Sequence, residues 1–122
     1  MPDILLSVGW GVRKMTKSGW IGLDVGGTGI KAGLVVDGEV LFERSLKTGV
    51  SSDKAILEQL LSLSSELIND AGKMYSVAGI GVAVPGTIDA QQGVAIAAAN
   101  LPWNQTPICA FLSERTGLAA FL

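Results

Sequence analysis

Hydrophobic and polar residues follow two different periods along the chain, and the change of period separates strands from helices. Three segments rich in Val, Ile and Leu come first, at residues 20–25, 30–36 and 39–47. A glycine cluster at 26–29 separates the first two, and Asp37-Gly38, a dipeptide typical of two-residue hairpin turns, separates the second from the third. The pattern predicts three consecutive antiparallel strands before any helix.

The next segment repeats its apolar residues at helical spacing. Residues 51–53 (Ser-Ser-Asp) supply candidate N-caps, and Gly72 is a candidate C-cap, so we expect a helix over residues 53–71. A broad apolar stripe on this helix would face the core, and it consists of Ile56, Leu60, Leu63 and Leu67.

Shorter elements follow the helix. Residues 77–84 are small, apolar and without alternation, as expected of a strand covered on both faces, and Pro85-Gly86 ends it. The predicted elements after it are a hairpin at 87–98, a loop at 100–103, a short helix capped by Thr106 and closed by Gly117, and a strand at 118–122. The order predicts an α/β fold with one mixed sheet, in which three antiparallel strands are followed by α-β-α-β.

Composition narrows the functions open to this chain. Its 122 residues leave room for one hydrophobic core, and 48% hydrophobic against 16% charged residues excludes a disordered chain. The net charge of −2 leaves no broad basic surface, so we expect neither nucleic-acid nor membrane binding. Histidine is absent and Cys109 is the one cysteine, which excludes the usual zinc sites, imidazole catalysis and an internal disulfide.

The apolar run at residues 4–12 is too short to span a membrane. An acidic residue precedes it and basic residues follow it, the reverse of a secretory signal. We expect a cytoplasmic protein in which residues 1–18 form a disordered N-terminal extension and residues 19–122 form the domain.

The candidate chemistry lies in the turn after the first predicted strand. Asp24 is the acid of that strand, and Gly26, Gly27 and Thr28 follow it. Such a turn exposes backbone N–H groups that can cradle phosphate oxygens, and we expect a positive φ at Gly27. An acid beside a phosphate implies Mg²⁺ between them, held by Asp24 through waters, while the Thr28 hydroxyl and Lys31 would add a donor and a positive charge.

Two other interpretations of these glycines exist. A dinucleotide-binding fingerprint requires a helix to begin at its third glycine, whereas a strand pattern follows Gly29. An ordinary glycine-rich hairpin with a solvated Asp24 is the open alternative.

Three motifs in order carry a resemblance to a known family. Asp24-Val-Gly-Gly-Thr-Gly-Ile-Lys31 resembles the first phosphate motif of the superfamily of sugar kinases, actin and heat-shock chaperone ATPases. Gly79-Ile-Gly-Val-Ala-Val-Pro-Gly86 with Thr87-Ile-Asp89, and then Ala99-Asn100-Leu-Pro-Trp103, resemble the ROK family (repressors, open reading frames, kinases), especially its glucokinase-like members. The resemblance runs from Trp20 to Leu122.

The resemblance implies a ribonuclease-H-like (actin-like ATPase) lobe of an ATP-dependent sugar kinase acting on a hexose such as glucose or on a hexosamine. ATP, or polyphosphate as in some relatives, is the implied donor, and Mg²⁺ the implied metal. The implied residues are Asp24, Gly26, Gly27, Thr28, Gly29 and Lys31 for nucleotide phosphate, Asp24 for metal, and Pro85, Gly86 and Asn100 for sugar. Family members are commonly homodimers.

The sequence also departs from the family. The catalytic base of ROK kinases is the Asp of an Asn-Asp pair after the strand that here begins at Leu118, and the 122 residues do not reach it. The zinc motif, the second lobe and the C-terminal helix that covers the first lobe are also missing. We therefore expect an N-terminal fragment that has no catalytic residue, is inactive alone and self-associates.

Two alternatives to a kinase fragment stay open. One is a non-functional remnant. The other is a ROK-type transcriptional regulator, which would need a helix-turn-helix module before the lobe, and residues 1–19 are too few and too glycine-rich for one.

Overall fold

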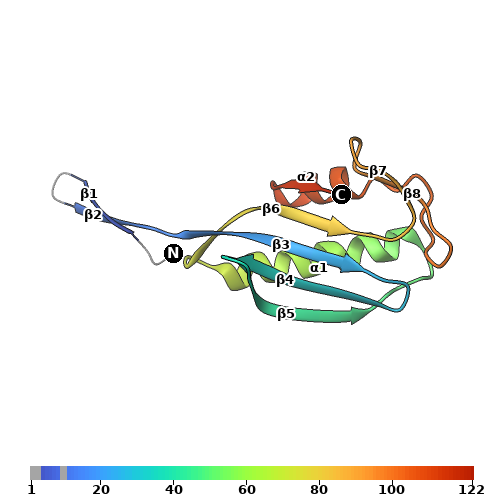
Figure 1. Ribbon diagram of the computed structural model, residues 1–122, viewed down its shortest axis with the longest axis horizontal. Helices are drawn as coiled ribbons and strands as arrows, with labels where there is room; N and C mark the ends of the chain where they lie inside the picture. Colours follow the sequence, from blue (N-terminus) through green and yellow to red (C-terminus); the bar gives the residue numbers. More distant parts are fainter. Residues whose placement is uncertain (1–3, 9–10) are drawn as a thin grey trace.

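The computed structural model describes residues 4–8 and 11–122, with side chains from residue 16 onward. Strands β1 (Ile4–Val8) and β2 (Gly11–Met15) pair antiparallel and lie apart from the main sheet (Figure 1). The sequence predicts disorder here, whereas these segments form a paired ladder. Residues 1–3 and 9–10 of the predicted extension lie outside the described residues. The boundary at residue 18 stays a prediction, since β3 begins at Lys17.

One five-stranded mixed sheet, ordered β5-β4-β3-β6-β9, organises the rest of the chain. β3 (Lys17–Val25), β4 (Gly29–Val36) and β5 (Glu39–Lys47) form the expected antiparallel meander. β6 (Tyr75–Ala83) pairs parallel with β3, and β9 (Ala119–Phe121) pairs parallel with β6. The predicted mixed sheet of an α/β fold is confirmed.

The long helix α1 (Asp53–Ala71) covers one face of this sheet and packs against β3, β4, β5 and β6 (Figure 1). It begins as expected, because the Ser52 hydroxyl accepts a hydrogen bond from the Ala55 N–H. It ends at Gly72, whose φ of 55° is open to glycine and whose N–H donates to the Ile68 carbonyl.

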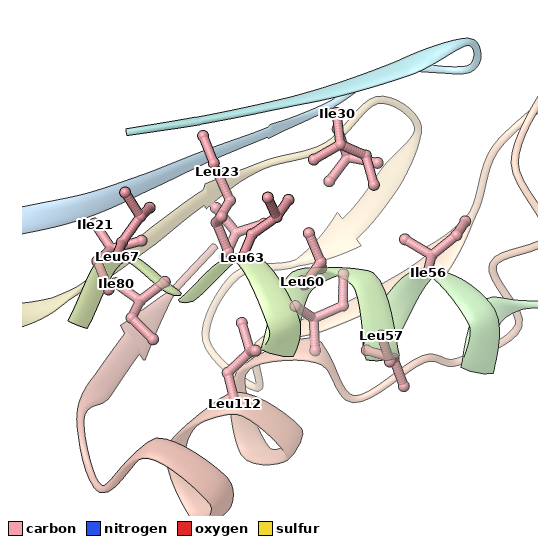
Figure 2. Packing of buried hydrophobic residues seen from close by; sticks show 14 of the residues in the cluster. Ile21, Leu23, Ile30, Ile56, Leu57, Leu60, Leu63, Leu67, Ile80 and Leu112 are labelled. Atoms are coloured by element: carbon pink, nitrogen blue, oxygen red, sulfur yellow. The ribbon is translucent and has the colours of Figure 1, made fainter. Parts of the chain in front are cut away.

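The core lies between α1 and the sheet. The alternating residues of β3 and β4 that face α1 are almost fully buried, as are the residues of the predicted apolar stripe. Figure 2 shows this packing, with Ile21, Leu23, Ile30 and Ile80 from the sheet and Ile56, Leu60, Leu63 and Leu67 from α1.

The second helix, α2 (Ile108–Thr116), lies beside α1 and next to β9. Gly117 ends it as expected, at a φ of 74°. The predicted cap at Thr106 is wrong: Pro107 occupies the N-cap position without a side-chain capping bond, because the Thr106 hydroxyl is bonded to Asp53 instead. The expected hairpin is present as β7 (Thr87–Asp89) and β8 (Val94–Ala97).

The opposite face of the sheet, called the open face below, carries a row of glycines. Gly22 of β3 is the register partner of Gly33 on β4 and of Gly81 on β6, so three neighbouring strands present no side chain there. Trp20 and Phe121 lie at one side of the row, with ring centroids 5.9 Å apart and exposures of 44% and 56%. Within residues 16–122 the helices α1 and α2 contact one another, and α1 packs on the face of the sheet opposite to the open face.

Candidate functional site

A cavity of about 600 Å³ opens where β3 and β6 end. Ligands of α/β sheets bind outside the carboxyl ends of parallel strands, and β3 and β6 are such a pair. The cavity joins the two groups of predicted site residues: Asp24, Gly26 and Gly27 from the first, and Pro85, Gly86 and Asn100 from the second. Its other lining residues are Val25, Ala83, Val84, Ala98 and Ala99.

The turn at 26–28 is a closed hairpin turn. The Gly26 N–H donates to the Gly29 carbonyl at 2.8 Å, so this group is engaged within the protein. The expectation of a positive φ at Gly27 is wrong, since Gly27 is not among the residues with positive φ. Glycine at position 27 instead leaves space beside Asn100, because a Cβ there would lie 3.4 Å from the Asn100 Cβ.

Thr48 stabilises the turn by hydrogen bonds to its carbonyl groups, a role that no sequence motif indicates. Its buried hydroxyl donates to the Gly26 carbonyl at 2.7 Å, and its N–H donates to the Thr28 carbonyl at 3.2 Å. Both carbonyl oxygens are thereby bound to Thr48. This arrangement favours the N–H side of the turn as the side that meets an anion.

Asp24 and Lys31 are exposed register partners on β3 and β4 and therefore lie on one face of the sheet. Asp24 lines the cavity and Lys31 does not. Lys31 borders a hollow of about 330 Å³ over β4 and β5, and both residues border a hollow of about 220 Å³ over β3, β4 and β5. Thr28 and Gly29 lie outside the cavity lining too. Of the predicted phosphate residues, the structure thus brings Asp24, Gly26 and Gly27 into the cavity.

The Pro85-Gly86 segment forms another wall of the cavity by close backbone contact. Gly86 has a φ of 101°, and a Cβ there would lie 2.3 Å from the Ala97 carbonyl oxygen and 2.6 Å from the Ala98 Cβ. Only glycine satisfies both the conformation and the distance. The chain after β6 therefore packs directly against the chain after β8.

The loop that carries Asn100 is fixed by its apolar residues. Leu101 and Trp103 are each 6% exposed and belong to the core side of the loop, while Asn100 is exposed at the cavity. An amide side chain offers both a donor and an acceptor to a hydroxyl group. The loop thus presents the side chain that the sequence analysis assigns to sugar.

The remaining candidate groups lie outside the cavity lining. Cys109 is buried, and burial raises the pKa of its thiol, which keeps it protonated and unreactive.

The described residues contain no group of three or more His, Cys, Asp or Glu side chains that could form a metal site by themselves. No described helix is long and apolar enough to cross a membrane.

Comparison with known proteins agrees with this geometry. The sequence profile of the ROK family matches residues 20–122. The glucokinase of Thermotoga maritima is 33% identical over 110 residues, which cover 88% of this chain and 34% of the glucokinase. The xylose repressor of Caldicellulosiruptor bescii is 32% identical over 90 residues, which cover 70% of this chain and 22% of the repressor.

A solved structure shows the same fold. The inorganic polyphosphate/ATP-glucomannokinase of Arthrobacter sp. strain KM matches with a TM-score of 0.68 and 33% identity, over 84% of this chain and 42% of that one. The expected sugar-kinase type of lobe is confirmed. The chain spans about a third of the length of the glucokinase that it matches.

Proposed function

Because the chain belongs to the ROK family, we propose that it forms the nucleotide- and sugar-binding wall of a sugar kinase that transfers a phosphoryl group from ATP to a hexose or hexosamine. The observation that supports this most is the single cavity bounded by Asp24, Gly27 and Asn100. A phosphate donor and a hydroxyl acceptor must meet in one place for transfer to occur, and this cavity borders both candidate subsites.

The phosphate subsite is the N–H side of the 26–28 turn. The Gly27 and Thr28 N–H groups and the Thr28 hydroxyl are suited to donate to phosphate oxygens, because Thr48 holds the turn by its carbonyls. The glycines of the turn leave room for phosphate oxygens to approach the backbone closely. Either ATP or polyphosphate presents this chemistry.

The residues present fit Mg²⁺ held mostly by water. Asp24 offers an exposed carboxylate at the cavity, and one carboxylate together with waters and phosphate oxygens is a usual magnesium environment. When bound, the ion would neutralise charge on the transferring phosphoryl group. Asp24 would hold it and keep it next to the turn.

The cavity provides a sugar contact and lacks a base for the sugar hydroxyl. Asn100 and the Pro85-Gly86 wall would orient the acceptor, while Asp24 is the one ionisable side chain among the described lining residues. A carboxylate committed to Mg²⁺ cannot also serve as a base. We therefore propose that these 122 residues alone do not catalyse phosphoryl transfer. The reaction, which we propose takes place in the cytoplasm, requires a base that the described lining residues do not supply.

The similarity to a xylose repressor supports a second candidate, a sugar-responsive transcriptional regulator of the same family. That function uses the sugar subsite without phosphoryl transfer. It predicts sugar binding that is independent of Mg-ATP, whereas the kinase proposal predicts binding of both.

The proposal is tested by titrating the chain with Mg-ATP and recording NMR shifts of the turn amides. One wall of a site should bind in the millimolar range, about 4 kcal/mol. Gly27→Val should abolish the shifts, because the added side chain fills the space toward Asn100. Gly81→Val is the matched control: it lies on the sheet, outside the cavity lining, with its Cβ 4.0 Å from its nearest neighbour. Unchanged shifts in Gly27→Val would show that the turn is not the phosphate site.

A further inference from the structure

Thr106 joins three segments of the chain through one fully buried side chain. Its hydroxyl donates to Asp53 Oδ2 at 2.8 Å and accepts from the Asn104 N–H at 3.0 Å. Its own N–H and carbonyl exchange hydrogen bonds with Ala95 of β8, at 2.8 and 2.9 Å. Thr106 thereby ties the start of α1 and the β7–β8 hairpin to the end of the loop at 98–105.

This loop needs such an anchor because its course is irregular. It begins where β8 ends at Ala97 and returns to β8 at Thr106, through a Gln105 with a φ of 50°. The Gln105 N–H donates to the Ile96 carbonyl at 3.2 Å, next to the Thr106 bonds. The hydrogen bonds that fix the loop to other elements therefore gather at its C-terminal end, six residues after Asn100.

Asn100 lies in this loop, beside the buried Leu101 and six residues before Thr106. On its other side Asn100 lies against Gly27, so a shift of the loop would alter the separation between the sugar subsite and the phosphate turn. Asp53 is the first residue of α1, a helix that packs on four strands of the sheet, which makes it a fixed reference point. A carboxylate that accepts from a buried hydroxyl forms a hydrogen bond stronger than one between neutral groups.

We propose that Asp53 and Thr106 are positioning residues that hold Asn100 at the correct place relative to the phosphate turn. The proposal rests on the proposed function, in which Asn100 contacts the sugar. Neither residue lines the cavity. They act through the loop, and their role goes beyond holding the fold together.

Hydrogen–deuterium exchange read by mass spectrometry on the 122-residue chain tests the anchor without any ligand. Thr106→Val keeps the shape of the side chain and removes the hydroxyl, so exchange in the segment 98–104 should rise about tenfold. Thr106→Ser restores the hydroxyl and should return exchange to the wild-type rate. Asp53→Ala should behave as Thr106→Val does.

Ser52→Ala is the matched control. It removes the capping bond to the Ala55 N–H at the same helix start and leaves the Asp53–Thr106 bond in place. It should speed exchange in the first turn of α1 and leave the segment 98–104 unchanged. Equal exchange of this segment in Thr106→Val and wild type, or an equal rise in Ser52→Ala, would overturn the anchor.

A second measurement adds glucose and Mg-ATP. The wild-type chain and Thr106→Ser should show protection of the segment 98–104, and Thr106→Val should lose it at the same ligand concentrations while β3 stays protected. Ligand protection that persists in Thr106→Val would overturn the positioning role. Absence of protection in the wild type would count against sugar binding at Asn100, while the ligand-free comparison would still decide whether the anchor exists.

Discussion

At Gly86 two steric demands fall on one residue, which makes it a sharp test of the cavity wall. Gly86→Ala places a methyl group 2.3 Å from the Ala97 carbonyl oxygen at a φ of 101°. Relief requires the segment after β6 to move away from the segment after β8. We expect a loss of more than about 2 kcal/mol in the free energy of unfolding, measured by urea denaturation.

Gly38→Ala is the control for the conformational part of that loss. Gly38 has a φ of 79° with no atom within 4 Å of the added Cβ. It should cost about 1 kcal/mol, since the left-handed conformation is the one obstacle. Equal losses for the two variants would mean that the close contact between the two segments does not constrain the cavity.

Residue chemistry also limits what the sequence could reveal about the site. The predicted site residues stand out in the sequence because they belong to recognisable motifs. The structure places most of them around one cavity; the exceptions are Thr28, Gly29 and Lys31. Thr48 and Thr106 belong to no motif. Their hydroxyl partners are 22 and 53 positions away, and such pairs become visible only after the chain has folded.

At the scale of elements, hydrophobic periodicity and the capping and turn residues predict most of the boundaries. The strands β4 and β5 and the helix α1 lie within a residue of where apolar spacing and caps placed them, because each has local signals at both ends. The start of α2 differs from the prediction, because the Thr106 hydroxyl that a cap would need is bonded to Asp53 of α1. The β1–β2 ladder was not expected, since its segment lacks a clear alternation.

The helix α1 contributes to stability through the side that faces the sheet. Leu60 is fully buried, so Leu60→Ala should lower the free energy of unfolding by about 2 to 5 kcal/mol, the range for deleting a buried leucine side chain. The neighbouring Leu61 is only partly buried, and Leu61→Ala should cost clearly less. Urea denaturation of both variants gives the comparison. Equal losses would contradict the arrangement of α1 that Figure 2 shows.

At the scale of the whole molecule, the open face is the feature that sets behaviour in solution. The glycine row leaves the centre of this face without side chains, and Trp20 and Phe121 add exposed aromatic surface beside it. Contiguous exposed apolar surface favours association, and β9 is a sheet edge without a charged residue. We expect the chain to self-associate, which sedimentation velocity would show as a mass that rises with concentration.

Phe121→Glu should shift this association toward the monomer, because it places a charge at the edge and on the open face. Met74→Glu is the matched control: Met74 is 67% exposed but lies in the turn between α1 and β6. It should leave the association unchanged. A concentration-independent monomer of the wild-type chain would show that the open face needs no cover.

The order of strands in the sheet also bears on the order in which the chain folds. β3, β4 and β5 are neighbours in sequence as well as in space, whereas β6 reaches β3 only after the whole of α1, and β9 reaches β6 only after the hairpin and α2. Closing a short loop costs less entropy than closing a long one, so the meander can form first, even while later residues are still being synthesised. The turn at residues 26–28 is then the first part of the cavity to form, and the loop that carries Asn100 is among the last.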